Sequence, residues 1–417
     1  MKNSRARCIL HSDLNNFYAS VELLRRPELK DKPVAVCGSS EDRHGIVLAK
    51  NGLAKATGIK TGEVFWQAKQ KCPDLVRVPA DFPSYIRVSE AVRRIYDRYT
   101  DRIEPFGIDE CWLDVTESVP LFGSGRAIAE EIRETVKKEI GVTVSVGVSW
   151  NKIFAKLASD IKKPDAVTEI TPENYRETAW KLPASDLLYV GKATARKLSF
   201  LGIASIGDLA QADEGKLVTE LGKWGSYLHT YANGDDMSPV SLRGAEREAK
   251  SIGNSLTCYR DLMDEDEVHV LMLLLADSVA ARLKETDLGR ARTVKISVTD
   301  NELHHYGKQG KPLSPIKSAK AISDCAMKLF RELYPWTRPV RAVGVSVCDF
   351  TGDAQQLDLF SDFQKDVREE KLDEAIASLR GKYGNAVVRR ATVLKDKRLA
   401  QLDVKGAHVI HPEGRHD

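Results

Sequence analysis

Three acidic residues interrupt segments of this chain that are otherwise apolar. Asp13 follows the apolar residues 8–10, and Asp109 and Glu110 stand side by side in the segment FGIDECWLDV, residues 106–115. Carboxylate oxygens are the ligands that Mg²⁺ prefers in proteins. Two such ions held close together can activate a hydroxyl group and stabilise a leaving pyrophosphate. If the three side chains converge, the sequence predicts a metal-dependent site for phosphoryl transfer.

Whether they converge depends on the backbone around the acidic pair. Adjacent residues of a flat strand point to opposite faces of the sheet, so Asp109 and Glu110 reach one site only if the chain turns there. Gly107, two residues earlier, could permit such a turn. Acidic residues are also common at strand ends, as helix caps or ion-pair partners. The residue types alone leave both interpretations open.

The elements that position these carboxylates follow from the pattern of apolar residues. Alternating or continuous apolar residues predict strands, and apolar residues spaced four apart predict amphipathic helices. Strands are predicted at residues 8–10, 32–37, 45–49 and 142–148, and helices at residues 126–140 and after a cap at Asn15 or Asn16. Because strands and helices alternate in residues 1–170, this part is an α/β or α+β body.

The pattern changes twice in the second half of the chain. Residues 174–238 predict short helices separated by glycines. Residues 249–350 predict strand, helix, strand, strand, helix and strand, a βαββαβ order typical of a separate compact domain. A polar, charge-rich tail with one helix and one apolar pentapeptide follows. The chain is therefore expected to be an α+β protein of several domains.

Composition narrows the class of protein but not its function. Of 417 residues, 63 are Lys or Arg and 60 are Asp or Glu, a net charge of +3 that by itself does not indicate nucleic-acid binding. The seven cysteines are scattered without a CxxC pair, which argues against a disulfide framework or a zinc site and favours a reducing cytosol. No signal peptide and no membrane span are expected.

Three longer motifs narrow the interpretation of the carboxylates. Residues 11–22, HSDLNNFYASVE, resemble the opening motif of Y-family DNA polymerases, which is roughly D-x-D-x-F-[FY]-A-x-V-E. Residues 108–116, IDECWLDVT, resemble their S-I-D-E-x-x-L-D-V-T motif, and residues 145–164 resemble their third signature. Order and spacing agree over most of the chain. The likeness is greatest to the bacterial members of this family.

The resemblance implies a right-hand polymerase fold with palm, fingers, helical thumb and a βαββαβ little-finger domain. The implied boundaries are residues 1–24 and 82–173 for the catalytic palm, 25–81 for the fingers, 174–238 for the thumb, 249–350 for the DNA-binding little finger and 351–417 for a C-terminal tail.

The implied activity is low-fidelity, template-directed DNA synthesis past damaged or undamaged bases, without a proofreading exonuclease, in DNA repair and damage tolerance. Asp13, Asp109 and Glu110, with the backbone carbonyl of Leu14, would hold two Mg²⁺ ions. The substrates would be primer–template DNA and deoxynucleoside triphosphates (dNTPs).

Residues near the first motif would select the nucleotide. The resemblance makes Tyr18 a steric gate against a ribose 2′-hydroxyl, although simple core packing would also explain this ring. The backbone N–H groups of Asn16, Phe17 and Tyr18, at a helix N-terminus, would hold the triphosphate, together with Lys163 and Lys55.

The chain departs from the family pattern at three places. Gly52 and Lys55 stand where family members usually carry a Tyr and an Arg that contact the triphosphate. Lys55 keeps the charge but lacks the two-pronged geometry of Arg. Asn15 stands in place of the second Asp of the first motif, a position that is not a metal ligand in the family.

Two regions would hold DNA. Gly191 and Lys192 belong to a segment similar to a helix–hairpin–helix, whose backbone N–H groups face a phosphate; an ordinary helical turn is the alternative. Arg290, Arg292 and Lys295 of the little finger would grip the duplex backbone without sequence preference. A solvated basic strand edge would have the same composition.

The pentapeptide at residues 356–360 resembles the Q-L-x-L-F peptide by which bacterial polymerases dock on the sliding clamp. Gln356, Leu357, Leu359 and Phe360 would carry that contact, and packing within the chain is the alternative. The expected protein is a monomer of the cytoplasm, associated with the nucleoid and not with membranes.

Two rival functions remain. A catalytically weak, clamp-bound adaptor for mutagenic repair would lack the metal carboxylates, whereas this chain keeps all three. A nucleotidyl cyclase also uses paired acids on a hairpin, but it would have no use for a helix–hairpin–helix or a clamp peptide.

Overall fold

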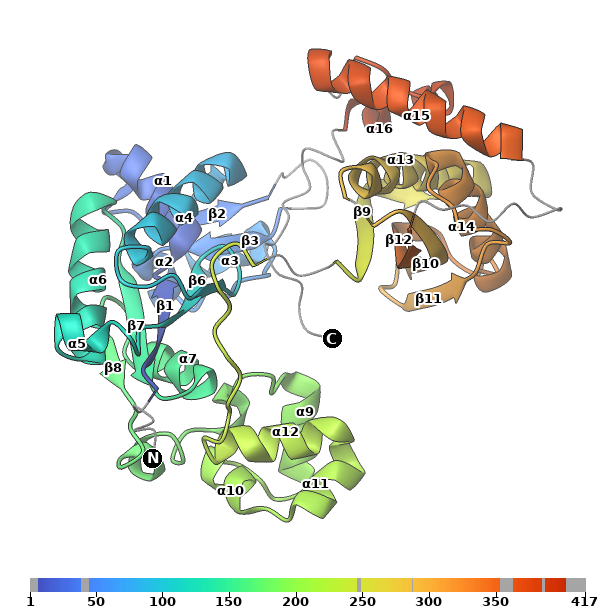
Figure 1. Cartoon of the computed structure of the whole chain (residues 1–417). Coiled ribbons are helices and arrows are strands. Elements are labelled where there is room, and N and C mark those ends of the chain that lie inside the picture. Colours follow the sequence, from blue (N-terminus) through green and yellow to red (C-terminus); the bar gives the residue numbers. More distant parts are fainter. Residues whose placement is uncertain are drawn as a thin grey trace. The chain divides into compact units, whose positions relative to one another are not determined.

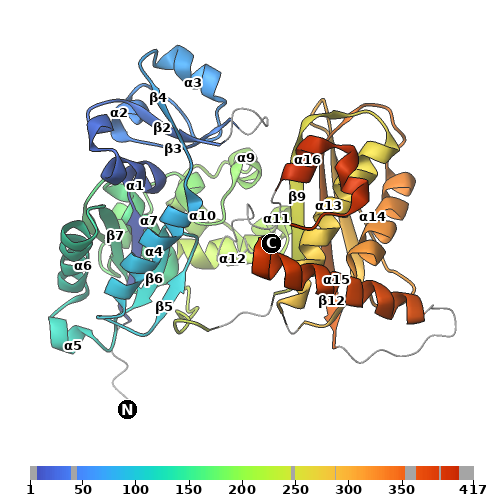
Figure 2. The same ribbon diagram turned by 90° about the horizontal axis from the view of Figure 1, so that it is seen from above.

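The computed structural model describes residues 7–38, 45–245, 249–286, 288–352, 363–384 and 387–402. These residues divide into two compact units. The first comprises residues 7–38 and 46–245, and the second comprises Gly45 and the described residues from 249 onward. Figures 1 and 2 show the elements of each unit from two directions.

A five-stranded sheet forms the centre of the first unit, with the strand order β5-β6-β1-β7-β8. All neighbouring pairs are antiparallel except β7 and β8. The strands are β1 (Ile9–Leu14), β5 (Ile103–Pro105), β6 (Glu110–Asp114), β7 (Val144–Ser149) and β8 (Val167–Glu169). The predicted strands at residues 8–10 and 142–148 are thus confirmed as β1 and β7.

Helices cover both faces of this sheet. One face packs against α1, α4, α5 and α6 around buried residues such as Leu10, Tyr85, Ile132 and Val146. Their bounds are α1 (Phe17–Arg25), α4 (Phe82–Tyr96), α5 (Val119–Phe122) and α6 (Gly125–Glu139). The other face packs against α7 (Lys152–Ile161).

Helix α7 approaches the sheet closely because β7 has glycine at the crossing point. A Cβ atom on Gly147 would lie 1.9 Å from the backbone oxygen of Ala155, which no real side chain tolerates. The missing side chain lets the helix backbone rest on the strand. This contact fixes how far the α7 side chains stand from those of β1.

A smaller sheet of the first unit has the order β3-β2-β4 and its own core, which includes Ala35, Val47, Ile59 and Leu75. Its elements are η1 (Pro27–Leu29), β2 (Val34–Cys37), β3 (Val47–Lys50), α2 (Gly52–Ala56), α3 (Phe65–Lys71) and β4 (Val76–Pro79). The strands predicted at 32–37 and 45–49 correspond to β2 and β3.

The first unit ends in a cluster of short helices around Leu198, Ile206, Leu217 and Leu228, as the sequence predicts. They are α8 (Tyr175–Thr178), η2 (Ala184–Asp186), α9 (Lys192–Phe200), α10 (Ile206–Gln211), α11 (Glu214–Leu221) and α12 (Lys223–Ala232).

The second unit contains a four-stranded antiparallel sheet in the order β11-β10-β12-β9. Its elements are β9 (Ser251–Leu262), α13 (Glu265–Lys284), β10 (Arg290–Asp300), β11 (His305–Gly310), α14 (Ala319–Leu333) and β12 (Val340–Thr351). The predicted βαββαβ order is confirmed.

Helix α13 carries the longest apolar stretch of the sequence, and its side chains are buried among the sheet and α14. Within the ranges that the structure describes, no helix is both long and apolar enough to cross a membrane.

The tail contains more structure than the single predicted helix. Helix α15 (Phe363–Tyr383), η3 (Ala391–Lys395) and α16 (Lys397–Gln401) belong to the second unit, where α15 contacts α14 and η3 contacts α13. Asp373 accepts a hydrogen bond from the backbone N–H of Ala319 at 2.8 Å and pairs with Arg390. Val393 and Leu399 join the core.

Candidate active site

The pairing of β1 with β6 brings two of the predicted ligands together. Asp13 is the direct partner of Glu110 in the antiparallel register, and His11 is the partner of Trp112. Directly paired residues project to the same face of a sheet. Both carboxylates therefore stand side by side on the face that packs against α7.

Asp109 lies in the bend before β6, where the sequence predicts a turn at Gly107. The φ angle of Gly107 is 107°, in the region that favours glycine. Helix α4 holds this bend, because Arg93 donates to the carbonyl of Gly107 at 2.9 Å and Ser89 donates to that of Ile108. The Asp109 carbonyl accepts from the backbone N–H of Leu14 at 3.0 Å, so the bend is fastened to β1.

Two lysines neutralise the paired carboxylates. Lys163 Nζ lies 2.7 Å from Asp13 Oδ2, and Lys156 Nζ donates to Glu110 Oε2. No group of three or more acidic, His or Cys side chains has metal-binding geometry within the described ranges. The donors nevertheless consist of carboxylate oxygens only, and two of them already hold cationic groups. This donor set fits a hard divalent cation such as Mg²⁺.

Burial and mutual repulsion give these acids different pKa values. Burial and the charge of Glu110 raise the pKa of Asp13 to about 7, although Lys163 opposes the rise. Burial also raises the pKa of Asp109, again with Glu110 as a contributor. Burial opposes ionisation of Glu110 too, but its contacts with His11 and Lys156 outweigh burial and lower its pKa to about 2.

His11 is a member of this cluster that sequence reasoning missed. The ring is fully buried, its Nδ1 lies 2.9 Å from Ser159 Oγ, and its Nε2 lies 3.3 Å from Glu110 Oε2. Burial, helped by the charge of Lys156, lowers its pKa to about 4, so the ring is neutral at pH 7. Its position two residues before Asp13, on the same strand face, was the available signal.

Lys156 was missed as well, although it lies inside the third motif. Helix α7 is buried along Phe154, Leu157 and Ala158, yet it carries lysines four residues apart. Lys152 pairs with the buried Glu104 at 2.6 Å, and Lys156 pairs with Glu110. Lysines spaced four apart on an otherwise apolar helix indicate partners on the element beneath it.

Tyr18 lies in a cluster of aromatic rings at the start of α1. Its ring stacks on Tyr85, with centroids 4.4 Å apart, and meets Phe82 edge-on at 5.7 Å. Asn16 begins the helix as predicted, but in a left-handed conformation (φ 49°) and without a side-chain cap. The first N–H groups of a helix have no partner within the helix, so this terminus can bind an anion.

Two of the departures from the family pattern, Gly52 and Lys55, lie in helix α2 beside the smaller sheet. A Cβ atom on Gly52 would meet no other atom within 4 Å, and the Lys55 side chain is exposed. Asn51 caps α2 through the backbone N–H of Ala54 at 3.0 Å. A bulkier residue at position 52 would therefore project into open space.

The predicted hairpin residues lie at the N-terminus of α9. Gly191 is its N-cap, and Lys192 is its first residue; both are exposed. Tyr189, two residues before Gly191, has a φ of 71°. Its ring packs against Trp224 at 5.3 Å and Tyr231 at 6.0 Å, contacts that offset this unfavourable backbone conformation.

The three basic residues predicted to contact DNA in the second unit separate into two groups. Arg292 and Lys295 are exposed. Arg290 is only 7% exposed, and its two terminal nitrogens lie 2.6 and 2.8 Å from the carboxylate of Glu370. This buried pair ties β10 to α15.

The pentapeptide at residues 356–360, with Gln356, Leu357, Leu359 and Phe360, lies outside the described residues.

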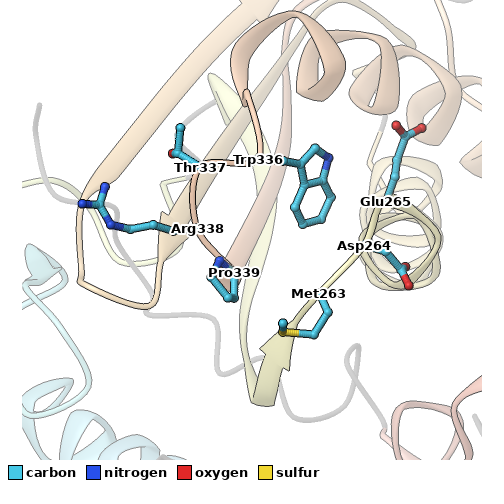
Figure 3. Close-up of a pocket in the computed structure, with 7 residues that line it drawn as sticks. All are labelled: Met263, Asp264, Glu265, Trp336, Thr337, Arg338 and Pro339. Atoms are coloured by element: carbon cyan, nitrogen blue, oxygen red, sulfur yellow. The ribbon is translucent and has the colours of Figure 1, made fainter.

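The second unit also contains a cavity of about 390 Å³ beside Trp336 and Met263, between the start of α13 and the loop before β12 (Figure 3). Its charged residues are already engaged: Asp264 caps α13, Glu265 binds Arg331, and Arg338 binds Glu302. The cavity contains none of the predicted site residues.

Comparison with known proteins gives one consistent result. The profile of the impB/mucB/samB family matches residues 12–160, and the profile of its C-terminal domain matches residues 249–359. A DNA polymerase IV of Acetivibrio thermocellus is 51% identical over 95% of this chain and 100% of its own length. A DNA polymerase IV of Bacillus subtilis is 38% identical over 94% of each chain.

Solved structures agree with these sequence relatives. A Y-family DNA polymerase chimera has a TM-score of 0.73 at 27% identity and covers 82% of this chain and 99% of its own. A ternary complex of the polymerase Dbh has a TM-score of 0.57, also at 27% identity, with the same coverage of both chains.

The raised pKa of Asp13 predicts a stability effect in metal-free protein. The folded state keeps the Asp13 proton up to about pH 7, whereas the unfolded chain releases it near pH 4. Stability is therefore lost as the pH rises through this window. We expect Asp13→Asn to raise the free energy of unfolding at pH 8 by about 1–3 kcal/mol, and by much less at pH 5.

Urea denaturation in EDTA at both pH values measures this difference. The exposed Asp74→Asn serves as the control and should change stability by less than about 0.5 kcal/mol at either pH. An equal effect of Asp13→Asn at pH 5 and pH 8 would contradict the assignment.

Proposed function

Because this chain belongs to the Y-family of DNA polymerases, as a member of the impB/mucB/samB family and a relative of bacterial DNA polymerase IV, we propose that Asp13, Asp109 and Glu110 are its catalytic metal ligands. The protein is a metal-dependent, DNA-directed DNA polymerase of the translesion type, with a role in DNA repair. The observation that carries the proposal is the direct pairing of Asp13 with Glu110, with Asp109 in the adjoining bend.

We propose two Mg²⁺ ions, held by these three side chains and the carbonyl of Leu14. Bound there, the ions would activate the primer 3′-hydroxyl and stabilise the leaving pyrophosphate. Divalent ions would compete with the ammonium groups of Lys163 and Lys156 for the carboxylates. Lys163, once released from Asp13, has its charge available for the incoming triphosphate.

The nucleotide would lie against the start of α1. Backbone N–H groups of Asn16, Phe17 and Tyr18 are suited to the triphosphate, and Lys55 adds an exposed positive charge. The Tyr18 ring is held by its stacking on Tyr85, so it forms a rigid wall beside the sugar rather than a mobile one.

We propose that the five-stranded sheet and its helices form the palm, and that the three-stranded sheet belongs to the fingers. We likewise assign the short helices to the thumb and the four-stranded sheet to the little finger. We assign DNA-backbone contacts to Gly191 and Lys192 and to Arg292 and Lys295, and we leave out Arg290 because Glu370 occupies it.

We also propose that residues 356–360 bind the sliding clamp, since the pentapeptide follows the last polymerase domain, and that the enzyme acts as a monomer at the nucleoid in the cytoplasm. Its DNA substrate supports this location. The clamp-bound adaptor is the less favoured alternative, because the carboxylate register would then have no purpose.

Primer extension tests the enzymatic assignment. We expect purified protein with Mg²⁺ to extend primers on intact and lesion-bearing templates. Replacing Asp109 by Asn together with Glu110 by Gln should reduce extension by about 100-fold or more, because charge stabilisation in the transition state is lost. Asp74→Asn should have wild-type activity. A folded double variant that still extends primers at the wild-type rate would refute the site.

Sugar selectivity tests Tyr18. We expect Tyr18→Ala to raise ribonucleotide incorporation relative to deoxynucleotide by about tenfold or more, because an open space replaces the ring. The matched control is Tyr18→Phe, which keeps the ring and should keep the discrimination. Unchanged selectivity of Tyr18→Ala, measured as the ratio of kcat/KM for the two nucleotides, would reject the gate.

Clamp stimulation tests the pentapeptide. Deletion of residues 356–360 should remove the increase in product length that a loaded clamp produces, while synthesis without the clamp continues. A variant with the same five residues in scrambled order separates sequence recognition from linker length. If the deleted protein is stimulated as strongly as the wild type, the peptide is not the docking site.

A further inference from the structure

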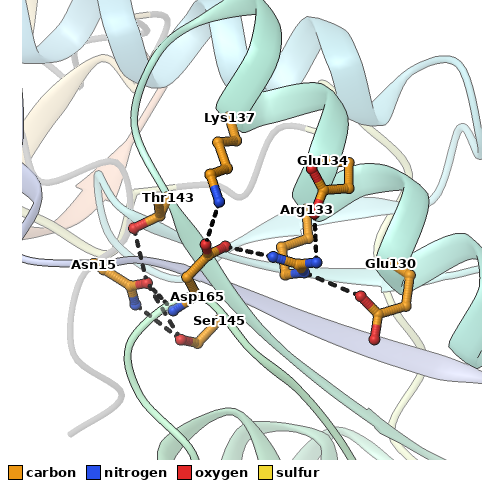
Figure 4. Close-up of polar contacts among 8 residues, drawn as sticks. All are labelled: Asn15, Glu130, Arg133, Glu134, Lys137, Thr143, Ser145 and Asp165. Carbon is orange, nitrogen blue, oxygen red and sulfur yellow. Dashed lines mark hydrogen bonds and ion pairs between the residues drawn. The ribbon is translucent and has the colours of Figure 1, made fainter.

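The segment that carries Lys163 is fastened on both sides by its neighbour Asp165 (Figure 4). The Asp165 carboxylate lies 2.8 Å from Arg133 Nη1 and 2.7 Å from Lys137 Nζ, both on α6. Its backbone N–H donates to Asn15 Oδ1 at 2.7 Å. One residue thus joins this segment to a helix and to the end of β1.

Asn15 forms the other half of the fastening. Its side chain is buried, its Nδ2 donates to Ser145 Oγ at 2.9 Å, and its Oδ1 also accepts from Thr143 Oγ1 at 3.1 Å. Its backbone N–H donates to the carbonyl of Thr143 at 2.9 Å. The amide therefore bridges β1, β7 and the Asp165 backbone, two residues from the metal carboxylate Asp13.

These contacts fix a turn in the backbone next to Lys163. Asp165 has a φ of 56°, in the left-handed region, which aspartate adopts only occasionally and as a single residue. Arg133 is in turn held by Glu130 at 3.0 Å and by Glu134. The guanidinium group that binds Asp165 is therefore itself held in place.

Lys163 needs such support because a lysine side chain has many rotamers. Its Nζ lies 2.7 Å from both Asp13 Oδ2 and Asp160 Oδ1, so the ammonium group has two competing carboxylates. The backbone at Lys163, two residues before Asp165, determines where the ammonium group can lie. Moving that backbone moves the charge relative to Asp13.

We propose that Asn15, Asp165, Arg133 and Lys137 form an anchor that positions Lys163 for the triphosphate of the incoming nucleotide. Asn15 and Asp165 are positioning residues, since neither is proposed to contact the nucleotide. This inference rests on the triphosphate role of Lys163 proposed above.

The anchor gives a reason for the amide at position 15, where family members have a carboxylate. An aspartate there would still accept from the Asp165 N–H, but it could not donate to Ser145 Oγ. It would also add a negative charge next to Asp165 and near Asp13. Because the amide of Asn15 is neutral, it does not compete with the Asp165 carboxylate for Arg133 and Lys137.

Single-turnover nucleotide incorporation tests the anchor, because it separates the maximal rate from the half-saturating dNTP concentration. We expect Asp165→Ala to raise the half-saturating concentration about 5- to 20-fold and to change the maximal rate less than about twofold. Asp165→Asn, which keeps an oxygen for Arg133, should give an intermediate value. Asn15→Asp should raise the concentration as well.

Combination with Lys163→Met distinguishes positioning from a general loss of structure. If Asp165 acts through Lys163, adding Asp165→Ala to Lys163→Met should change the half-saturating concentration less than about twofold, because residues coupled through a backbone shift are not additive. The control is Glu139→Ala, which removes the exposed pair with Arg98 at the end of the same helix and should have no effect.

Each other outcome overturns a defined part of the proposal. An Asp165→Ala effect that persists in full beside Lys163→Met, or that Glu139→Ala reproduces, eliminates the anchor and leaves the role of Lys163 intact. If Lys163→Met itself leaves nucleotide saturation unchanged, the triphosphate role fails and the anchor fails with it. If Asp165→Ala does not fold, as judged by its melting temperature, the double variant Arg133→Met/Lys137→Met replaces it with the same expected outcomes.

Discussion

Electrostatic repulsion between Asp13 and Glu110 is the constraint on which the first unit depends. The register of β1 against β6 forces the two carboxylates onto one face, partly buried. Unpaired buried charges are costly, so the surrounding elements must supply positive charge or protons. Lys156 and Lys163 supply the charge, and the raised pKa of Asp13 supplies the proton. The negative charge of the carboxylates is therefore largely compensated within the protein before any ligand binds.

Close packing of α7 is what makes this compensation possible. Gly147 lets the helix backbone touch β7, which brings Lys156 within reach of Glu110 and Ser159 within reach of His11. A larger residue at position 147 would push the helix away and leave the carboxylates without partners. A residue without a side chain thus determines the electrostatics of a site in which it takes no direct part.

The sequence predicts local features well and distant pairings poorly. Strands such as β1 and β7 and the βαββαβ order followed from residue patterns, and the turn at Gly107 followed from the need to bring two adjacent acids together. The partner of Arg290 could not be predicted, because Glu370 lies 80 residues further along in a helix whose docking no local pattern encodes. The contact of His11 with Ser159 could not be predicted for a similar reason, since Ser159 lies 148 residues away.

The lysine–carboxylate pairs also imply that metal and nucleotide load together. Two of the three carboxylates pair with ammonium groups, and Asp109 feels the charge of both lysines without such a pair, which leaves a small negative excess. Two divalent ions alone would reverse that sign strongly, and a triphosphate alone would meet unneutralised acids. Each ligand therefore removes the electrostatic penalty of the other, and thermodynamic reciprocity requires the two affinities to rise by the same factor. If two Mg²⁺ ions bind as proposed, a polymerase with this charge balance would hold few ions while it waits on DNA and would become fully loaded only when a nucleotide arrives.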